Sequence, residues 1–141
     1  MPEDRLTIEL EIAAPAEAVW AAWTDPQTAL RWFGSDPNGH GLEAAMDVRP
    51  EGRFELTFQN SDGTEFTCMG IYDTVVPPRD LHFSWVWKSE PETTSHVSIS
   101  LSPRGAGTRM HFTHEGFGKT SAHDYAIGWA STFEKLKRLL E

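Results

Sequence analysis

Helical sequence patterns occur at both ends of this chain and almost nowhere between them. Residues 15–34 contain two short tryptophan-rich segments, the first beginning at Pro15, a residue that suits the first turn of a helix. Residues 121–141 carry apolar side chains at three- and four-residue steps, which predicts one long amphipathic helix. Most of the intervening sequence has the alternation of β-strands. Helices that bracket a run of strands are typical of an α+β fold with an antiparallel sheet.

We predict about seven strands. Polar and apolar side chains alternate along them, as they do when one face of an antiparallel sheet is covered and the other is solvated. The sequence Asn-Ser-Asp-Gly at residues 60–63 predicts a hairpin turn, because Asp-Gly tolerates the positive φ that tight turns need. A loop is expected at residues 34–41. The predicted strands are residues 6–12, 44–48, 53–59, 65–75, 80–88, 93–101 and 108–115.

The apolar faces of these elements are rich in aromatic side chains. Phe83, Trp85 and Trp87 share one face of their strand, and the closing helix bears a stripe that includes Trp129 and Phe133. We expect the helix to cover the aromatic face of the sheet. The chain has 6 Trp and 8 Phe in 141 residues, which is more bulky surface than a minimal core requires. Most of these side chains are expected to fill the core and some to line a pocket.

Composition and charge narrow the functional classes. We expect one domain, residues 1–141, with a core of its own. A formal net charge of −9 argues against nucleic acid and anionic membrane surfaces as partners, since both require basic patches. No apolar run approaches the ~18 residues that span a bilayer, and the N-terminus lacks the pattern of a signal peptide. The single cysteine, Cys68, fits a reducing compartment, so we expect a cytoplasmic protein that does not bind membranes.

Motifs for catalysis or metal binding do not stand out. The sequence has no Gly-x-Ser-x-Gly motif, and no pair of carboxylates is conspicuous. Cys68 lies within a predicted strand, where it is expected to serve as a small apolar residue. His111 and His114 are three residues apart in a strand, so they face opposite sides and cannot chelate one metal ion. We predict no catalytic residue, no cofactor and no metal.

His114 is a polar residue on an apolar face, which it shares with Met110 and Phe112. Two hypotheses follow. The imidazole either hydrogen-bonds a ligand carbonyl or acts as a general acid–base, or it is a buried histidine that is satisfied by a backbone carbonyl.

Several stretches of the chain resemble one superfamily. They are residues 12–27, the sequence Leu-Arg-Trp-Phe-Gly at 30–34, Gly-Arg-Phe-Glu-Leu at 52–56, residues 63–85, and the Gly-Trp helix at 128–140. Together they resemble the START-related (SRPBCC) superfamily, and within it the small bacterial proteins similar to the activator of Hsp90 ATPase. The resemblance implies a helix-grip fold, in which a curved antiparallel sheet wraps around the C-terminal helix. Members of the superfamily bind lipids, hormones or polyketides, or act as cyclases.

A strongly curved sheet cannot touch a straight helix along its whole length, so we expect an apolar cavity between the two. The loop at residues 34–41 is expected near its mouth. Phe66 and Tyr72 are further candidates, depending on whether a bulge at Gly70 changes the face of their strand. The predicted cavity residues are Trp32, Phe58, Trp85, Trp87, Phe112, His114, Trp129 and Phe133.

Three functions remain open. The first is binding of a small apolar or aromatic ligand in this cavity. The second is a polyketide cyclase- or dehydratase-like enzyme that uses the same cavity, against which the lack of a recognisable acid–base pair counts. The third is a chaperone-interacting module, against which the length counts, because the Hsp90 activator has an additional domain. A homodimer is also plausible, since exposed edge strands of such sheets often pair.

Overall fold

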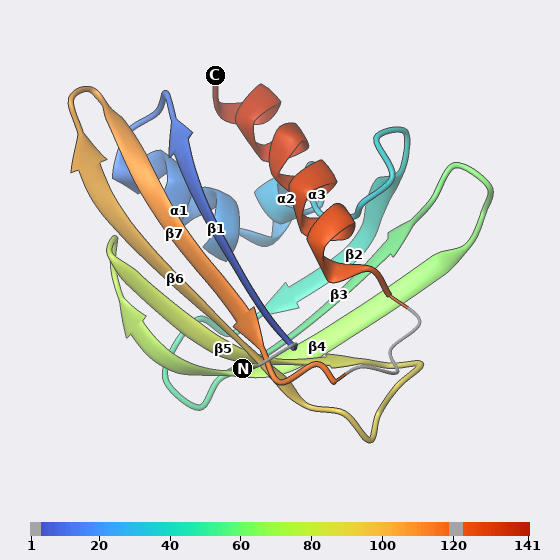
Figure 1. Cartoon of the computed structure of the whole chain (residues 1–141). Helices are drawn as coiled ribbons and strands as arrows, with labels where there is room; N and C mark the ends of the chain where they lie inside the picture. Colours follow the sequence, from blue (N-terminus) through green and yellow to red (C-terminus); the bar gives the residue numbers. More distant parts are fainter. Residues whose placement is uncertain (1–3, 119–122) are drawn as a thin grey trace.

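The computed structural model describes residues 4–118 and 123–141 (Figure 1). Its strands form one antiparallel seven-stranded sheet in the order β1-β7-β6-β5-β4-β3-β2. The strands are β1 (Arg5–Ile12), β2 (His40–Met46), β3 (Arg53–Gln59), β4 (Glu65–Val76), β5 (Asp80–Trp87), β6 (Ser95–Arg104) and β7 (Gly107–Glu115). The helices are α1 (Ala16–Thr24), α2 (Pro26–Ala29) and α3 (Tyr125–Leu140).

The sheet curves around α3, which lies along its concave side (Figure 1). The two short helices α1 and α2 follow β1 and lead to β2, so they connect the two edge strands of the sheet. This arrangement confirms the predicted α+β helix-grip fold. Within residues 4–118 and 123–141, no helix is both long and apolar enough to cross a bilayer.

Asp25 separates the two short helices. It follows the last residue of α1, and its carboxylate accepts the backbone N–H of Thr28 (3.2 Å), which caps α2. Pro26 takes the first position of α2, where no backbone N–H is needed. The resulting sharp turn brings Trp32 back against α1, and its Nε1–H donates to the carbonyl oxygen of Ala22 (2.9 Å).

The closing helix begins later than its sequence pattern indicated. Its first residue is Tyr125, because the carboxylate of Asp124 accepts the backbone N–H of Ile127 (3.0 Å) and caps the helix there. The predicted start fell within residues 119–122, which lie outside the described residues. The buried side chains of α3 follow the predicted stripe and are Tyr125, Trp129, Thr132, Phe133 and Leu136.

The second strand also differs from the prediction. We expected a loop to Gly41 and a strand at residues 44–48, but β2 begins at His40 and ends at Met46. Glycines and polar residues concealed its start. A Cβ at Gly41 would overlap the backbone of Leu30, so only glycine lets the strand pass this close to the end of α2.

A bulge in β4 determines which of its side chains face the core. The register against β5 shifts between Tyr72 and Thr74, rather than at Gly70 as we had considered. A Cβ at Gly70 would overlap the carbonyl oxygen of Ser84, which explains the glycine without a bulge. Phe66 and Tyr72 both precede the shift, so they share the inner face of β4.

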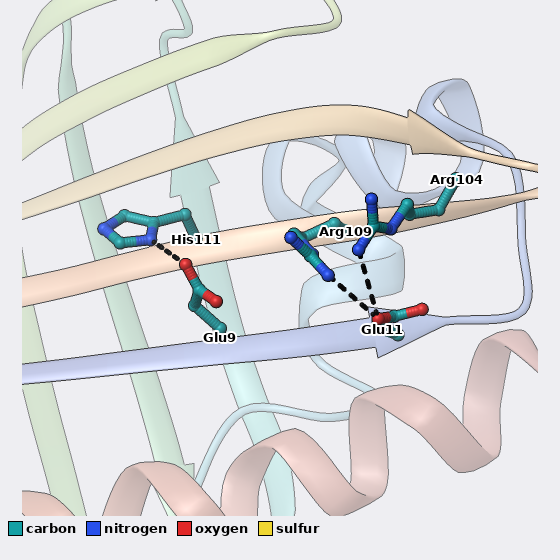
Figure 2. Close-up of polar contacts among 5 residues, drawn as sticks. All are labelled: Glu9, Glu11, Arg104, Arg109 and His111. Carbon is teal, nitrogen blue, oxygen red and sulfur yellow. Dashed lines mark hydrogen bonds and ion pairs between the residues drawn. The ribbon is translucent and has the colours of Figure 1, made fainter.

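Charged pairs cover the outer face of β1 and β7 (Figure 2). The carboxylate of Glu9 lies 3.0 Å from Nδ1 of His111, and that of Glu11 lies 3.2 Å from Arg109 and 4.0 Å from Arg104. All of these groups are largely exposed, so each pair stabilises the fold by about 0–1 kcal/mol. They mark the solvent side of the sheet, opposite the side that α3 covers.

Candidate functional site

A cavity of about 100 Å³ lies between the first turns of α3 and the inner faces of β3, β4 and β5. Seven phenylalanine, tryptophan and tyrosine rings form most of its wall, and the loop after α2 completes it. We call it the aromatic cavity. Its lining residues are Phe33, Gly34, Ser35, Phe58, Phe66, Trp85, Trp87, His123, Asp124, Tyr125, Gly128, Trp129 and Thr132.

The rings of the wall support one another by edge contacts. The ring centroids of Trp85 lie 5.2 Å from Trp87 and 5.3 Å from Trp129, and the ring planes are steeply inclined in both pairs. Phe58 and Phe66 pack against Trp87 at 6.0 Å and 6.2 Å. Such arrangements are favourable for aromatic pairs and restrict rotation of each ring. The wall is therefore a preformed apolar surface.

Gly128 leaves space where the stripe of α3 passes the cavity. It lies one turn after Tyr125 and one turn before Thr132, on the same face of the helix. The nearest heavy atom to a Cβ built at Gly128 is the Cβ of Ser35, at 3.8 Å. A larger side chain at this position would project into the cavity, so the glycine helps to keep the cavity open.

Hydrogen bonds fix the loop that borders the cavity. The Ser131 hydroxyl of α3 donates to the carbonyl oxygen of Ser35, and Lys135 Nζ donates to the carbonyl oxygen of Asp36 (3.0 Å). On the other side, the Asp36 carboxylate accepts the Ser61 N–H (2.7 Å) and hydroxyl (2.8 Å). The Ser61 N–H in particular lowers the pKa of Asp36. The loop is thereby tied to both α3 and the β3–β4 hairpin.

Gly34 allows this loop to pass close to the cavity wall. Its φ of +107° lies in the region that favours glycine. A Cβ there would also lie 2.9 Å from Cδ2 of Phe58, so any side chain would displace a ring of the wall.

His114 belongs to a buried hydrogen-bond chain beside the cavity. Trp129 Nε1–H donates to its Nδ1 (3.0 Å), and its Nε2 lies 2.7 Å from the Ser95 hydroxyl. Since the indole can only donate, Nδ1 must accept, and in the neutral ring Nε2–H then donates to Ser95. The Ser95 hydroxyl in turn donates to the carbonyl oxygen of Trp85 (3.2 Å). Each polar atom of His114 is therefore satisfied by the protein.

The environment of His114 holds it neutral. Its side chain is fully buried, and this burial lowers the pKa of His114 to about 3, with a smaller contribution from His96 in the same direction. A neutral imidazole with both nitrogens occupied is poorly placed to exchange protons with a ligand. Of the two hypotheses for His114, the structure supports the histidine that the protein satisfies, although a hydroxyl and an indole take the place of the expected backbone carbonyl.

His123 lies at the start of α3, at the rim of the cavity. Its ring stacks on Trp87 with centroids 4.0 Å apart, and its Nε2 lies 3.9 Å from the Glu90 carboxylate. Burial lowers the pKa of His123, and the Glu90 carboxylate opposes that shift. The imidazole thus extends the aromatic wall as a mostly neutral ring at pH 7.

The structure separates the eight predicted cavity residues into two groups. Phe58, Trp85, Trp87 and Trp129 line the aromatic cavity. Trp32, Phe112, His114 and Phe133 are buried but do not line it. Trp32, Phe112 and Phe133 pack around Trp23 of α1, which fills the space there, and His114 lies beside the cavity in its own hydrogen-bond chain.

Several lining residues were not recognised from the sequence. Phe33, and His123 and Asp124 just before α3, have no periodic signal that marks them as lining residues. Gly128 and Thr132 did carry a periodic signal, since both lie on the apolar stripe of the helix. A glycine within such a stripe marks a place where the helix lacks a side chain. The loop at residues 34–41 was expected near the mouth, and Gly34 and Ser35 do line the cavity.

The remaining reactive side chains offer no second site in the described parts of the chain. Cys68 is fully buried in the sheet, and desolvation raises the pKa of its thiol well above the usual range, which makes it unreactive. His111 pairs with Glu9 on the outer face (Figure 2). His114 is buried inside, which confirms that the two histidines face opposite sides. Among residues 4–118 and 123–141, no group of three or more metal-ligating side chains is assembled.

Comparisons with known proteins agree with this fold. Residues 13–141 match the family model described as "Activator of Hsp90 ATPase homolog 1-like protein". No curated protein matches the chain. A crystal structure of a protein from Nitrosomonas europaea is 24% identical, with a TM-score of 0.80, and the match covers 98% of this chain and 94% of that one.

Two further solved structures bear the family name. The AHSA1-like protein from Aeromonas hydrophila is 26% identical, with a TM-score of 0.79 and coverage of 95% of this chain and 90% of that one. The AHSA1 protein from Silicibacter pomeroyi is 25% identical, with a TM-score of 0.75 and 96% coverage of both chains. The chain therefore belongs to the family of activator of Hsp90 ATPase homolog 1-like proteins, within the START-related superfamily that its sequence resembles.

Proposed function

We propose that this protein binds a small apolar or aromatic compound in the aromatic cavity. The observation that carries the proposal is a cavity of about 100 Å³ walled by seven aromatic rings, at the place where α3 begins. Concave sites lined by aromatic side chains are typical of small-molecule binding. Members of this family commonly hold ligands in a cavity of this fold.

The volume of the cavity limits the size of the ligand. Sites that enclose drug-sized ligands have volumes of about 300–1,000 Å³, whereas an apolar cavity of about 150 Å³ in another protein binds benzene. The aromatic cavity, at about 100 Å³, is suited to a compound of one ring or a short aliphatic chain. A fused polycyclic compound would need additional space.

This reasoning favours binding over the other functions considered. A cyclase-like enzyme would require a proton-transferring group in the cavity, and His114, the group that the sequence suggested for this role, is neutral and hydrogen-bonded on both nitrogens beside it. No feature of the described residues specifically favours a chaperone-interacting role. Binding without turnover is the simplest function consistent with the cavity.

An NMR titration of the full chain with ethylbenzene tests the proposal. We expect saturable shifts of the Trp85, Trp87 and Trp129 indole signals. Gly128→Leu should abolish this binding, because its side chain would occupy the cavity. Ala130→Leu is the matched control, since Ala130 lies on the exposed side of the same helix and its variant should bind as the wild type does.

Native mass spectrometry of the purified protein provides the independent measurement. A co-purifying small molecule that is lost in Gly128→Leu and retained in Ala130→Leu would support the proposal. If ethylbenzene causes no saturable shifts, or if Gly128→Leu binds it as tightly as the wild type, the cavity is not a binding site.

A further inference from the structure

The indole N–H groups of the tryptophans in the core and the cavity wall differ in whether they have a hydrogen-bond acceptor. Trp23 donates to the sulfur of Met110 (3.4 Å), and Trp32 donates to the carbonyl oxygen of Ala22 (2.9 Å). In the wall of the aromatic cavity, Trp87 donates to the Tyr125 hydroxyl (3.0 Å) and Trp129 to Nδ1 of His114 (3.0 Å). Trp85 is the exception. Among residues 4–118 and 123–141, no acceptor lies within hydrogen-bond reach of its Nε1, although that atom is buried.

The unpaired N–H group of Trp85 lowers the stability of the fold. A buried donor that lacks a partner loses its hydrogen bond to water and gains nothing in return. Trp85 is only 3% exposed, so bulk water does not reach it freely. A group of this kind inside a folded protein calls for an explanation, and a missing bound molecule is one.

The position of Trp85 indicates where such a molecule would lie. Trp85 belongs to the wall of the aromatic cavity, between Trp87 and Trp129. A compound in the aromatic cavity therefore contacts the indole of Trp85, whose N–H is unused, while the N–H groups of the two neighbouring indoles are already committed to Tyr125 and His114.

We propose that the ligand of the aromatic cavity is a neutral compound with a carbonyl oxygen, and that Trp85 Nε1–H donates a hydrogen bond to that oxygen. The inference rests on the proposed function and specifies the chemical class of its ligand. Trp85 is then the residue that selects for the polar group, and the surrounding rings select for the apolar body.

The charge of the site distinguishes this class from others. Among the described lining residues there is no lysine or arginine, and Asp124 contributes a carboxylate at the rim, so an anionic ligand has no counter-ion. A cation would be attracted by the ring faces, but it cannot accept a hydrogen bond from Trp85. A hydrocarbon would fill the space and leave the donor unsatisfied. Only a neutral acceptor satisfies both the rings and the N–H group.

A matched pair of ligands tests this inference on the full chain. Acetophenone and ethylbenzene have nearly the same shape, and acetophenone alone has a carbonyl oxygen. We expect acetophenone to bind about fivefold more tightly, which is the effect of one neutral hydrogen bond in a buried site. In ¹H–¹⁵N spectra both compounds should shift the Trp85 indole signal, but only acetophenone should move the indole proton downfield, as a new hydrogen bond does.

Two variants of the cavity wall complete the experiment. Trp85→Phe identifies the Trp85 signal and should bind the two compounds with equal affinity. Trp87→Phe removes a similar volume from the same wall, but its N–H is already used, so both affinities should fall together and the fivefold ratio should remain. If Trp85→Phe does not fold, the ligand pair and the indole shift in the wild type still decide the question.

The outcomes separate this inference from the function on which it rests. If neither compound binds, the proposed function fails, and this inference fails with it. If both bind equally and the Trp85 proton responds alike to each, the cavity binds ligands but not through a carbonyl, and this inference alone is overturned. Tighter binding of phenyltrimethylammonium or benzoate than of acetophenone would also overturn it, in favour of a charged ligand.

Discussion

The two ends of the concave face are equally aromatic, yet one is packed and the other is hollow. At the closed end, Trp23 of α1 lies among Phe33, Phe54 and Phe83, and the void that remains there is only about 10 Å³. At the open end, where α3 begins, seven aromatic rings surround a cavity of about 100 Å³. The closed end is filled because α1 inserts Trp23, whereas α3 presents Gly128 to the open end. Aromatic content therefore does not determine where a cavity forms; the covering element does.

Removing a large ring should be most costly at the closed end. Trp23 is 3% exposed and packs against Trp32, so Trp23→Ala should lower the free energy of unfolding by about 3–5 kcal/mol. Trp87→Ala at the open end should cost only about 1–2 kcal/mol, because its ring is half-buried and borders empty space. Urea denaturation of both variants measures the difference. Equal losses would mean that the two ends are packed alike.

The buried chain around His114, between the two ends, should make stability depend on pH. The folded pKa of His114, about 3, lies below the ordinary value of 6.5, so the unfolded chain takes up the proton first as the pH falls. Stability is thus fully present above pH 6.5 and declines by about 1.4 kcal/mol per pH unit below it, or about 2–3 kcal/mol by pH 4.5. Denaturation curves at several pH values measure this slope.

His114→Asn should be less stable at pH 7 and should lose most of this slope, since asparagine does not titrate. His123→Asn is the control. Burial also lowers the pKa of His123, but this residue is partly exposed, so its variant should keep most of the slope. A slope that is the same in wild type and His114→Asn would contradict the assignment of His114 as a buried neutral residue.

The Ser95 hydroxyl should contribute more to the free energy of unfolding than the hydroxyl of an exposed serine in the same strand. Ser95→Ala leaves the His114 Nε2–H without its acceptor, which should cost about 1–3 kcal/mol. Ser100→Ala removes an exposed hydroxyl that donates to Asp80 and should cost at most about 0.5 kcal/mol. The ¹⁵N shifts of the His114 ring would report the tautomer directly. Similar losses for the two serines would argue against the hydrogen-bond chain.

Added volume should have opposite effects at the two ends. Gly128→Ala at the open end should raise the free energy of unfolding by up to about 1 kcal/mol, because alanine is the better helix former and its Cβ meets nothing closer than 3.8 Å. Ala22→Val at the closed end should lower it by about 1–3 kcal/mol, since Ala22 is fully buried in packed surroundings. Thermal unfolding compares the two, and a loss of stability in Gly128→Ala would show that the open end has no spare room.

Most of the fold could be predicted because its signals are local or periodic. Residues 53–59 alternate so clearly that the predicted strand coincides with β3. The end of β6 was missed because Pro103 suggested a turn. Beyond Ser100, however, β6 has lost its β5 neighbour, so the missing N–H of proline costs nothing on that side.

The candidate site was predicted only in part, because a cavity depends on what covers it. The sequence showed that Trp85 and Phe112 face inward, but not that Trp23 of α1 fills the space beside Phe112 while the space beside Trp85 stays open. The tautomer of His114 and the unpaired N–H of Trp85 depend on distances between residues remote in sequence. No periodic pattern encodes such distances.

A crystal structure of the protein grown with acetophenone tests the central claim most directly. The account predicts density for one molecule in the aromatic cavity, with its ring among Phe58, Trp87 and Trp129 and its oxygen within hydrogen-bond distance of Trp85 Nε1. Density there with the oxygen turned away from Trp85 would leave the cavity as a binding site and remove the carbonyl selectivity. A cavity that is closed by its own side chains, with acetophenone absent or bound only elsewhere, would contradict the account.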